Sequence, residues 1–236
     1  MRMAGAFSLD ELNLEHRLKV PVSGNYTDSG SRGGIWTLGS NTRVDSPDNH
    51  NLGFGLDLAN AVYRDSPTWM TGTQDCTIMW WAKVAPGIDI TNHFCTAADT
   101  GIGYSGHEVD VIDDGTVNFA AGGNGTEGIA SSVNRKTRKV DPTSDLRDST
   151  WRHVAYTFSG VSAQKLYNDG VGAAFVDFDG SATTLGWGVS GIRWQVNVED
   201  WSNDMTVSDW GEIADVRLYS EQLSDARIDL IAKGRA

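Results

Sequence analysis

Apolar positions along the chain come mostly in short runs or alternate with polar ones, and Gly, Asn, Asp and Pro interrupt them between residues 20 and 210. A strand that buries one face places every second side chain in the core. Short alternating segments separated by turn residues therefore predict a many-stranded antiparallel β-sandwich. The best-supported strands span residues 76–84, 107–112, 116–120, 151–158, 165–168 and 211–219.

Two Asp-Gly pairs predict tight hairpins between these strands. A two-residue hairpin turn needs positive φ angles, which Asp-Gly and Asn-Gly adopt at low cost. Asp114-Gly115 separates the second strand from the third, and Asn168-Asp169-Gly170 follows the strand at 165–168. We therefore expect a hairpin at each of these two places.

The hydrophobic period changes near the C-terminus from two residues to nearly four. Ser224 is a good N-cap, and an apolar stripe of Ile228, Leu230 and Ile231 ends at Gly234. Residues of these types begin and end helices. A short C-terminal helix is expected at residues 225–233.

The N-terminal residues differ from the rest of the chain. Ser8 is followed three positions later by Glu11, the pattern of a capping box, so a short helix is expected at residues 8–15. Residues 1–17 show no strand alternation, and we predict that they form an N-terminal arm, or attachment segment, outside a sandwich of residues 18–236. The alternative is that their leucines pack on the sheet edge of the protein itself.

Net charge narrows the range of partners. The chain carries 31 acidic and 19 basic side chains, a formal net charge of −12. Nucleic acid is disfavoured as a partner because phosphate binding needs concentrated Lys and Arg. The basic run at residues 135–139 lies between Gly/Ser-rich and Pro/Asp-rich stretches and is expected to be a solvated loop. Docking onto an acidic neighbour is the alternative for this run.

Neither an export signal nor a membrane segment is expected. Charged residues interrupt residues 1–20, and no stretch of about 18 apolar residues occurs in the chain. Cys76 and Cys95 are the only cysteines. Free thiols are favoured, although a cross-strand pair remains open, and two cysteines alone make a poor zinc site.

Three segments, in this order, resemble laminin-G-like domains of the concanavalin-A-like superfamily. They are CTIMWWAKV at 76–84, TWRHVAYTFSGVSAQKLYNDGV at 150–171 and WGEIADVRLYSEQLSDARI at 210–228. The resemblance implies an all-β, antiparallel jelly-roll β-sandwich with a short C-terminal helix, which agrees with the strand pattern. The large aromatic residues of these segments are expected to be core anchors rather than ligand contacts: Trp80, Trp81, Trp151, Tyr156, Phe158 and Trp210.

The same resemblance raises a glucanase hypothesis. Glu108, Asp110 and Asp113 are similar to the E-x-D-x-x-E strand of retaining β-glucanases, which need two carboxylates about 5 to 5.5 Å apart. Asp113 is one methylene shorter than the glutamate of that motif, and it leads directly into a turn. We therefore predict no catalytic residues and no enzymatic activity, with a glucanase-like glycoside hydrolase as an alternative.

Tryptophans concentrate between residues 186 and 210. Trp187, Trp194 and Trp201 lie near Asn203 and Asp204 in the sequence. Sugars stack on aromatic rings while amide and carboxylate groups bind their hydroxyls, so these five residues form the predicted glycan-binding site. Core packing is the alternative for some of the tryptophans.

The sequence requires no cofactor, but calcium is an open hypothesis. Proteins of the resembled family often bind Ca²⁺ through oxygen ligands in loops. Five aspartates are expected in loops that could supply such ligands: Asp99, Asp177, Asp179, Asp204 and Asp209.

Together these features predict a non-catalytic surface-binding module that attaches to glycans or to a host surface. A single sandwich with a short N-terminal segment resembles structural proteins displayed by tailed bacteriophages. We therefore expect a phage virion decoration protein on the virion surface, which contacts virion or oligomer neighbours through its arm. The alternative is a bacterial lectin or adhesin that is extracellular or lies at the cell surface.

Overall fold

The computed structural model describes most of the regular secondary structure of the chain. The described residues are 14–21, 23–31, 33–39, 41–47, 54–57, 62–64, 75–86, 92–93, 96–98, 107–111, 117–122, 135–140, 146–159, 164–173, 175–179, 192–196 and 211–234.

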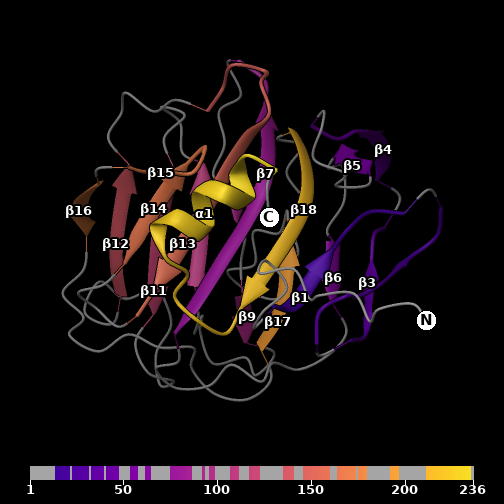
Figure 1. Ribbon diagram of the computed structural model, residues 1–236, viewed down its shortest axis with the longest axis horizontal. Coiled ribbons are helices and arrows are strands. Elements are labelled where there is room, and N and C mark those ends of the chain that lie inside the picture. Colours follow the sequence, from indigo (N-terminus) through magenta and orange to yellow (C-terminus); the bar gives the residue numbers. More distant parts are fainter. Residues whose placement is uncertain are drawn as a thin grey trace, which may run out of the picture.

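The described strands form three antiparallel sheets (Figure 1). The first sheet has eight strands, in the order β15 (Val171–Ala173), β14 (Lys165–Asn168), β13 (Arg152–Phe158), β7 (Cys76–Val84), β18 (Gly211–Tyr219), β5 (Phe54–Asp57) and β4 (Thr42–Asp45), and β1 (Leu14–Leu18) also pairs with β18. The second sheet contains β16 (Phe175–Asp179), β12 (Arg135–Val140), β11 (Val117–Gly122), β10 (His107–Val111) and β8 (Asn92–His93). The third contains β2 (Tyr26–Thr27), β3 (Ile35–Thr37), β6 (Val62–Arg64), β17 (Ile192–Val196) and β9 (Thr96–Ala98).

Helix α1 (Asp225–Ala232) lies across the face of β7 and β13 (Figure 1). The predicted all-β antiparallel sandwich with a short C-terminal helix is thus confirmed. No helix among the described residues is long and apolar enough to cross a membrane.

Strand β7 is buried on both of its faces. Alternate side chains point to opposite sides of a strand, so Met79 and Trp81 lie on one face, and Ile78 and Trp80 lie on the other. All four are nearly inaccessible to solvent. A strand covered on both sides is expected to be almost continuously apolar, and this is why CTIMWWAKV contains so few polar residues.

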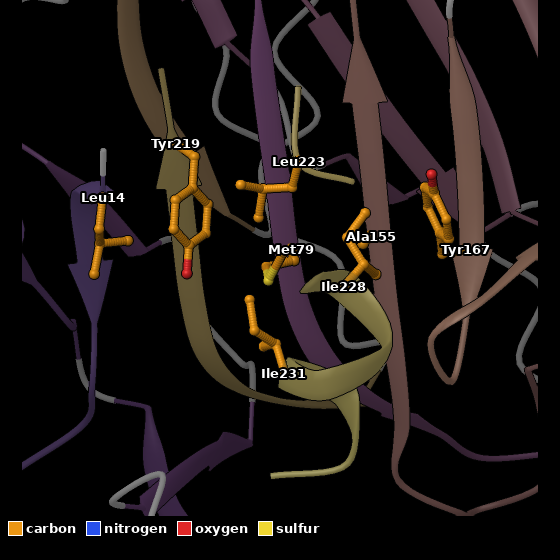
Figure 2. Close-up of a cluster of buried hydrophobic side chains, with 8 residues drawn as sticks. All are labelled: Leu14, Met79, Ala155, Tyr167, Tyr219, Leu223, Ile228 and Ile231. Carbon is orange, nitrogen blue, oxygen red and sulfur yellow. The ribbon is translucent and has the colours of Figure 1, made fainter. Parts of the chain in front are cut away.

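Helix α1 covers one end of the first of these faces, which we call the α1 face of the eight-stranded sheet. Figure 2 shows Ile228 and Ile231 of the helix pointing toward Met79 and Ala155 on the strands. The Thr77 hydroxyl accepts a hydrogen bond from Leu223 N and donates one to Glu221 O, which ties the segment before the helix to β7. Burial of each large apolar side chain contributes about 1.5 to 3 kcal/mol, so this docking stabilises the helix.

The ends of α1 agree with the sequence prediction. Ser224 is the N-cap, and its hydroxyl accepts a hydrogen bond from Arg227 N. Lys233 is the C-cap, and Gly234 follows with a positive φ of 62°. The helix expected at residues 225–233 is therefore confirmed.

One predicted hairpin is confirmed in full and the other through its strand pairing. Asn168 pairs with Val171, and between them Asp169 and Gly170 have φ values of 49° and 81°, as a type I′ turn requires. Strands β10 and β11 pair antiparallel from His107 opposite Ala121 to Val111 opposite Val117. The predicted turn residues Asp114 and Gly115 lie outside the described residues.

The N-terminal boundary predicted at residue 17 is wrong, because Leu14–Leu18 forms strand β1 of the eight-stranded sheet. The end of the predicted helix at residues 8–15 is wrong for the same reason. Leu14 and Leu18 are buried, and β1 covers hydrogen-bonding groups of β18 that would otherwise form an open edge. These two leucines pack on the protein's own sheet, as the alternative held. Residues 1–13 lie outside the described residues, and their attachment role stays a prediction.

The basic run at residues 135–139 is not the solvated loop that composition suggested. It forms strand β12, which pairs with β11 on one side and β16 on the other. Arg138 lies opposite Asp177 in the register of β12 and β16. Asp177 and Asp179, which were expected in a loop, are therefore strand residues of β16.

Candidate functional site

The structure describes little of the predicted glycan-binding site. Trp194 lies in β17, opposite Thr96 of β9. Trp187, Trp201, Asn203 and Asp204 lie outside the described residues. The predicted clustering of these five side chains stays a prediction.

The predicted metal ligands and the glucanase motif lie only partly within the described residues. Asp99, Asp204 and Asp209 are outside them, and no group of three or more His, Cys, Asp or Glu residues in the described part of the chain could hold a metal ion. Glu108 and Asp110 lie in β10, opposite Ala120 and Asn118 of β11. Asp113, the third carboxylate of the motif, is outside the described residues.

Cys76 is a free, fully buried thiol. Burial, followed by the nearby charge of Asp75, raises the pKa of this thiol well above its usual range. Cys95 lies outside the described residues. The raised pKa indicates a structural cysteine rather than a reactive one.

The predicted aromatic anchors divide into buried residues and one exception. Trp80, Trp81, Tyr156 and Phe158 are buried, as expected. Trp151 is only partly buried, and it packs against the cluster formed by Trp81 and Ala214. Trp210 lies outside the described residues.

Trp151 immediately precedes β13 and lies beside a pair of opposite charges. Lys83 Nζ is 6.0 Å from the centroid of the Trp151 ring and 2.8 Å from Glu212 Oε1. Lys83 lies directly opposite Glu212 in the register of β7 and β18. The strand pairing therefore holds an ammonium and a carboxylate next to a partly exposed indole.

Gly55 of β5 makes room for the indole. A Cβ atom at this position would lie 3.1 Å from Cη2 of Trp151 and 3.0 Å from Cγ2 of Val44. Such contacts are tighter than side chains normally tolerate, so a larger residue here would displace the ring. We call the group of Trp151, Lys83, Glu212 and Gly55 the Trp151 platform.

The Trp151 platform has the chemistry of a sugar-binding surface. An indole face accepts the C–H groups of a sugar, while an ammonium and a carboxylate bind its hydroxyls. The Trp151 ring packs on Trp81, which itself packs edge-on against the buried His153, with ring centroids 5.3 Å apart. Lys83, Glu212 and Gly55 of the platform lie in strands, and Trp151 directly precedes β13.

A buried charge network lies on the same α1 face. Arg17 Nε is 2.7 Å from Asp215 Oδ1, and Arg217 Nη2 is 2.8 Å from Asp215 Oδ2. Arg17 and Arg217 are directly opposite each other in the pairing of β1 with β18. We call Arg17, Asp215 and Arg217 the Asp215 network. Two like charges across a strand pair repel, and the single carboxylate of Asp215 offsets part of this repulsion.

Asp215 reaches this position through a β-bulge. The pairing of β18 with β7 passes from Ala214 opposite Trp81 to Arg217 opposite Met79, so β18 has one extra residue. Asp215 has a φ of 49°, in the left-handed region that Asp tolerates better than most residues. The bulge therefore turns a carboxylate toward both guanidinium groups.

The environment of Asp215 has opposing effects on its pKa. Burial by itself raises the pKa, but the charges of Arg217 and Arg17 and their hydrogen bonds together hold the pKa below its usual value. The pKa of nearby Lys19 is lowered by burial and by the charges of Arg17 and Arg217, although Asp215 opposes this effect. The Asp215 carboxylate thus interacts electrostatically with three neighbouring cations, Arg17, Arg217 and Lys19.

A second buried carboxylate fixes the outer side of β1. Asp28 accepts hydrogen bonds from Arg17 N at 2.8 Å, Gly30 N at 2.8 Å and Trp36 Nε1 at 2.9 Å. Ser31 N also donates to Leu14 O. These bonds satisfy polar groups that an edge strand would otherwise expose.

Sequence reasoning missed the Asp215 network, although one signal for it was present. The strand GEIADVRLY carries Asp215 and Arg217 within an otherwise largely apolar segment, and buried charges are usually paired. Arg17 was assigned to the arm, so its partner could not be recognised.

Comparison with known proteins identifies the class to which the chain belongs. A laminin G family model described as the concanavalin A-like lectin/glucanases superfamily matches residues 39–229. The chain therefore belongs to this superfamily, as the three sequence segments predicted. A search of curated proteins found no significant match.

Solved structures with a similar fold include toxin binding domains. The ligand binding domain of botulinum neurotoxin serotype D, in complex with N-acetylneuraminic acid, has a TM-score of 0.65 and 13% identity, covering 96% of this chain and 52% of that chain. The binding domain of Paraclostridial Mosquitocidal Protein 1 has a TM-score of 0.64 and 12% identity, covering 94% of this chain and 52% of that chain. At these identities the likeness shows the fold alone, and this chain spans about half the length of both.

Proposed function

We propose that this protein is a non-catalytic, lectin-like module that attaches to carbohydrate on a surface. The observation that carries the proposal is the concanavalin A-like sandwich of its superfamily, which includes lectins. The likeness to toxin domains that are named for binding, one of them in complex with N-acetylneuraminic acid, supports the same reading. Such modules bind through surface aromatics and polar groups rather than through a catalytic pair.

Two regions are candidates for the contact surface. The first contains the tryptophans predicted from the sequence, Trp187, Trp194 and Trp201, with Asn203 and Asp204. The second is the Trp151 platform, where a partly exposed indole lies beside Lys83 and Glu212. Both combine a sugar-stacking ring with groups that bind hydroxyls.

A glycan array followed by calorimetry tests the proposal. We expect the purified chain to bind a defined set of glycans, and Trp194→Ala or Trp151→Ala to weaken binding, depending on which region makes the contact. Val171→Ala is the matched control, because Val171 is 67% exposed on β15. Absence of binding to every glycan, from a protein that melts cooperatively, would contradict the proposal.

The non-catalytic part of the proposal has its own test. We expect no release of reducing sugar from β-1,3-glucans or mixed-linkage glucans. Release that disappears in Glu108→Gln would show a glucanase, since Glu108 of β10 is the first carboxylate of the glucanase-like motif.

We also propose, from the sequence architecture alone, that the module is displayed on a virion surface and that residues 1–13 contribute to its attachment. Mass spectrometry of purified particles tests the location. Deletion of residues 1–13 tests the attachment, because we expect the truncated chain to keep its melting temperature and to be lost from the particle. A truncated chain that unfolds would contradict the attachment role.

A further inference from the structure

We propose that Trp151 and Lys19 together form a binding site for a carboxylate-bearing sugar of an acidic glycan. The inference rests on the proposed lectin-like function and names the class of ligand.

Strand pairing brings the two residues together although they are far apart in the sequence. Val20 and Phe54 form an antiparallel bridge, in which Phe54 N donates to Val20 O at 3.1 Å. The next position along each antiparallel chain is Lys19 on one side and Gly55 on the other. The ring of Trp151 lies against Gly55. The strand pairing therefore places Lys19 next to Gly55, the residue against which the indole lies.

Both side chains belong to the α1 face. Residues directly opposite each other in paired strands share a face. Arg217 is opposite Met79, and Arg17 is opposite Arg217, so Arg17 lies on the α1 face. Lys19 is two positions after Arg17 and follows it on that face. Trp151 packs on Trp81 and Ala214, which are opposite each other on the same side of the sheet.

The charges around Lys19 favour an incoming anion. Arg17 and Arg217 share the single carboxylate of Asp215. The ammonium of Lys19 forms no ion pair with any residue that the structure describes. Burial and the two guanidinium charges lower the pKa of Lys19, and a second carboxylate beside it would relieve this effect. A ligand carboxylate can supply that charge. The region around Lys19 is thus locally positive, although the chain as a whole has a net charge of −12.

An acidic sugar matches this arrangement in both of its parts. Its ring carries C–H groups that stack on an indole, and its carboxylate is attached directly to the ring system, so one residue of glycan can contact Trp151 and Lys19 together. The Lys83–Glu212 pair beside the indole is already neutral and can bind hydroxyls. A neutral sugar would use the ring alone.

Calorimetry with a matched pair of ligands tests the inference. The ligands are the methyl glycoside of N-acetylneuraminic acid and its methyl ester, which differ in the carboxylate charge. The proteins are the full chain, Lys19→Met, Trp151→Ala and the control Lys233→Met, which removes an equal charge at the C-terminal end of α1. Glucuronic acid and a sulfated neutral sugar serve as further ligands, to separate carboxylate recognition from general attraction of anions.

We expect the full chain to bind the acid about ten-fold more tightly than the ester, the size of one charge-assisted hydrogen bond. Lys19→Met should remove this preference, and Trp151→Ala should weaken the binding of both ligands. Lys233→Met should change neither affinity. Because its surroundings disfavour the charged form of Lys19, Lys19→Met should keep the melting temperature, so a loss of binding would not reflect unfolding.

Three results would overturn the inference. They are equal affinity for acid and ester, an unchanged preference in Lys19→Met, and tighter binding of the sulfated sugar than of either carboxylate. If neutral glycans bind while the acid shows no advantage, only this inference falls. If no glycan of any kind binds, the proposed function falls with it.

Discussion

Two arginine–carboxylate networks in this protein have opposite composition. In the Asp215 network one carboxylate joins two guanidinium groups, Arg17 and Arg217. On the other side of β7, Arg152 joins two carboxylates, with 2.5 Å to Asp148 and 2.9 Å to Asp169. The distances are similar, but the side chains of the first network are 1 to 12% exposed and those of the second 35 to 41%.

The comparison teaches that burial, rather than geometry, decides what an ion pair contributes. Exposed pairs contribute about 0 to 1 kcal/mol because water and salt screen them. A buried charge that loses its partner costs about 3 to 5 kcal/mol, since the remaining charge stays desolvated. The Asp215 network therefore couples β1 to β18 strongly, whereas the Arg152 network only supports a turn.

The largest effect is expected from Asp215→Asn. Asn tolerates the positive φ at this position and has nearly the same shape, so the substitution removes mainly the charge. We expect a loss of about 3 kcal/mol or more in the free energy of unfolding, measured by urea denaturation. Asp148→Asn is the matched control and should cost less than about 1 kcal/mol. Equal losses in the two variants would refute the comparison.

The next largest effect is expected from acid, which should remove the contribution of Asp215 to stability. Because the folded pKa of Asp215 lies below the unfolded value of about 4, its contribution to stability is fully present above that pH and is lost as the pH falls through the lowered pKa. Arg17, Arg217 and Lys19 are the charged groups around it. Wild-type protein should therefore lose more stability than Asp215→Asn does as the pH falls below about 4. Parallel pH profiles for the two proteins would contradict this expectation.

A smaller effect is expected from Arg152→Met. This substitution keeps the apolar stem and removes the guanidinium from two partly exposed carboxylates. We expect a loss of about 0.2 to 1 kcal/mol, seen as a small decrease in the urea midpoint. A loss above about 2 kcal/mol would mean that Arg152 is a structural centre equal to Asp215.

Salt should give the smallest change and the finest test. Coupling energies come from two double-mutant cycles, Arg17→Met with Asp215→Asn and Arg152→Met with Asp148→Asn. Raising NaCl from about 0.05 to 0.5 M should reduce the second coupling energy by a few tenths of a kcal/mol and leave the first nearly unchanged. Equal salt dependence would place both networks in the same dielectric environment.

Four strands of the eight-stranded sheet, β7, β13, β14 and β18, could be predicted from the sequence. The strand at 76–84, the strand at 211–219 and the turn at Asp169-Gly170 match the structure closely. Each depends on local chemistry: apolar runs, alternation, and a Gly that accepts positive φ. The basic run at residues 135–139 was misjudged because a strand needs only neighbours on both sides, and β11 and β16 are distant in sequence.

The site could be predicted less well. The glycan-binding role of the tryptophans between residues 187 and 201 stays a prediction. Trp151 was assigned wholly to the core. Its ring packs on Trp81 and Ala214 and lies against Gly55, which come from other strands. Burial is a property of the packed sheet, and no local pattern in TWRHVAYTF distinguishes a half-covered indole from a covered one.

The sequence by itself determined the superfamily, the antiparallel sandwich and the C-terminal helix, because strand alternation, turn residues and helix caps act between neighbours in the chain. Only the tertiary structure decided that Leu14–Leu18 is a strand of the sheet and that Arg17 meets Asp215, 198 residues further along. The physical reason is that the identity of a charged residue in a sequence does not indicate whether its side chain is solvated or buried. Its role is set by the strands that pair around it.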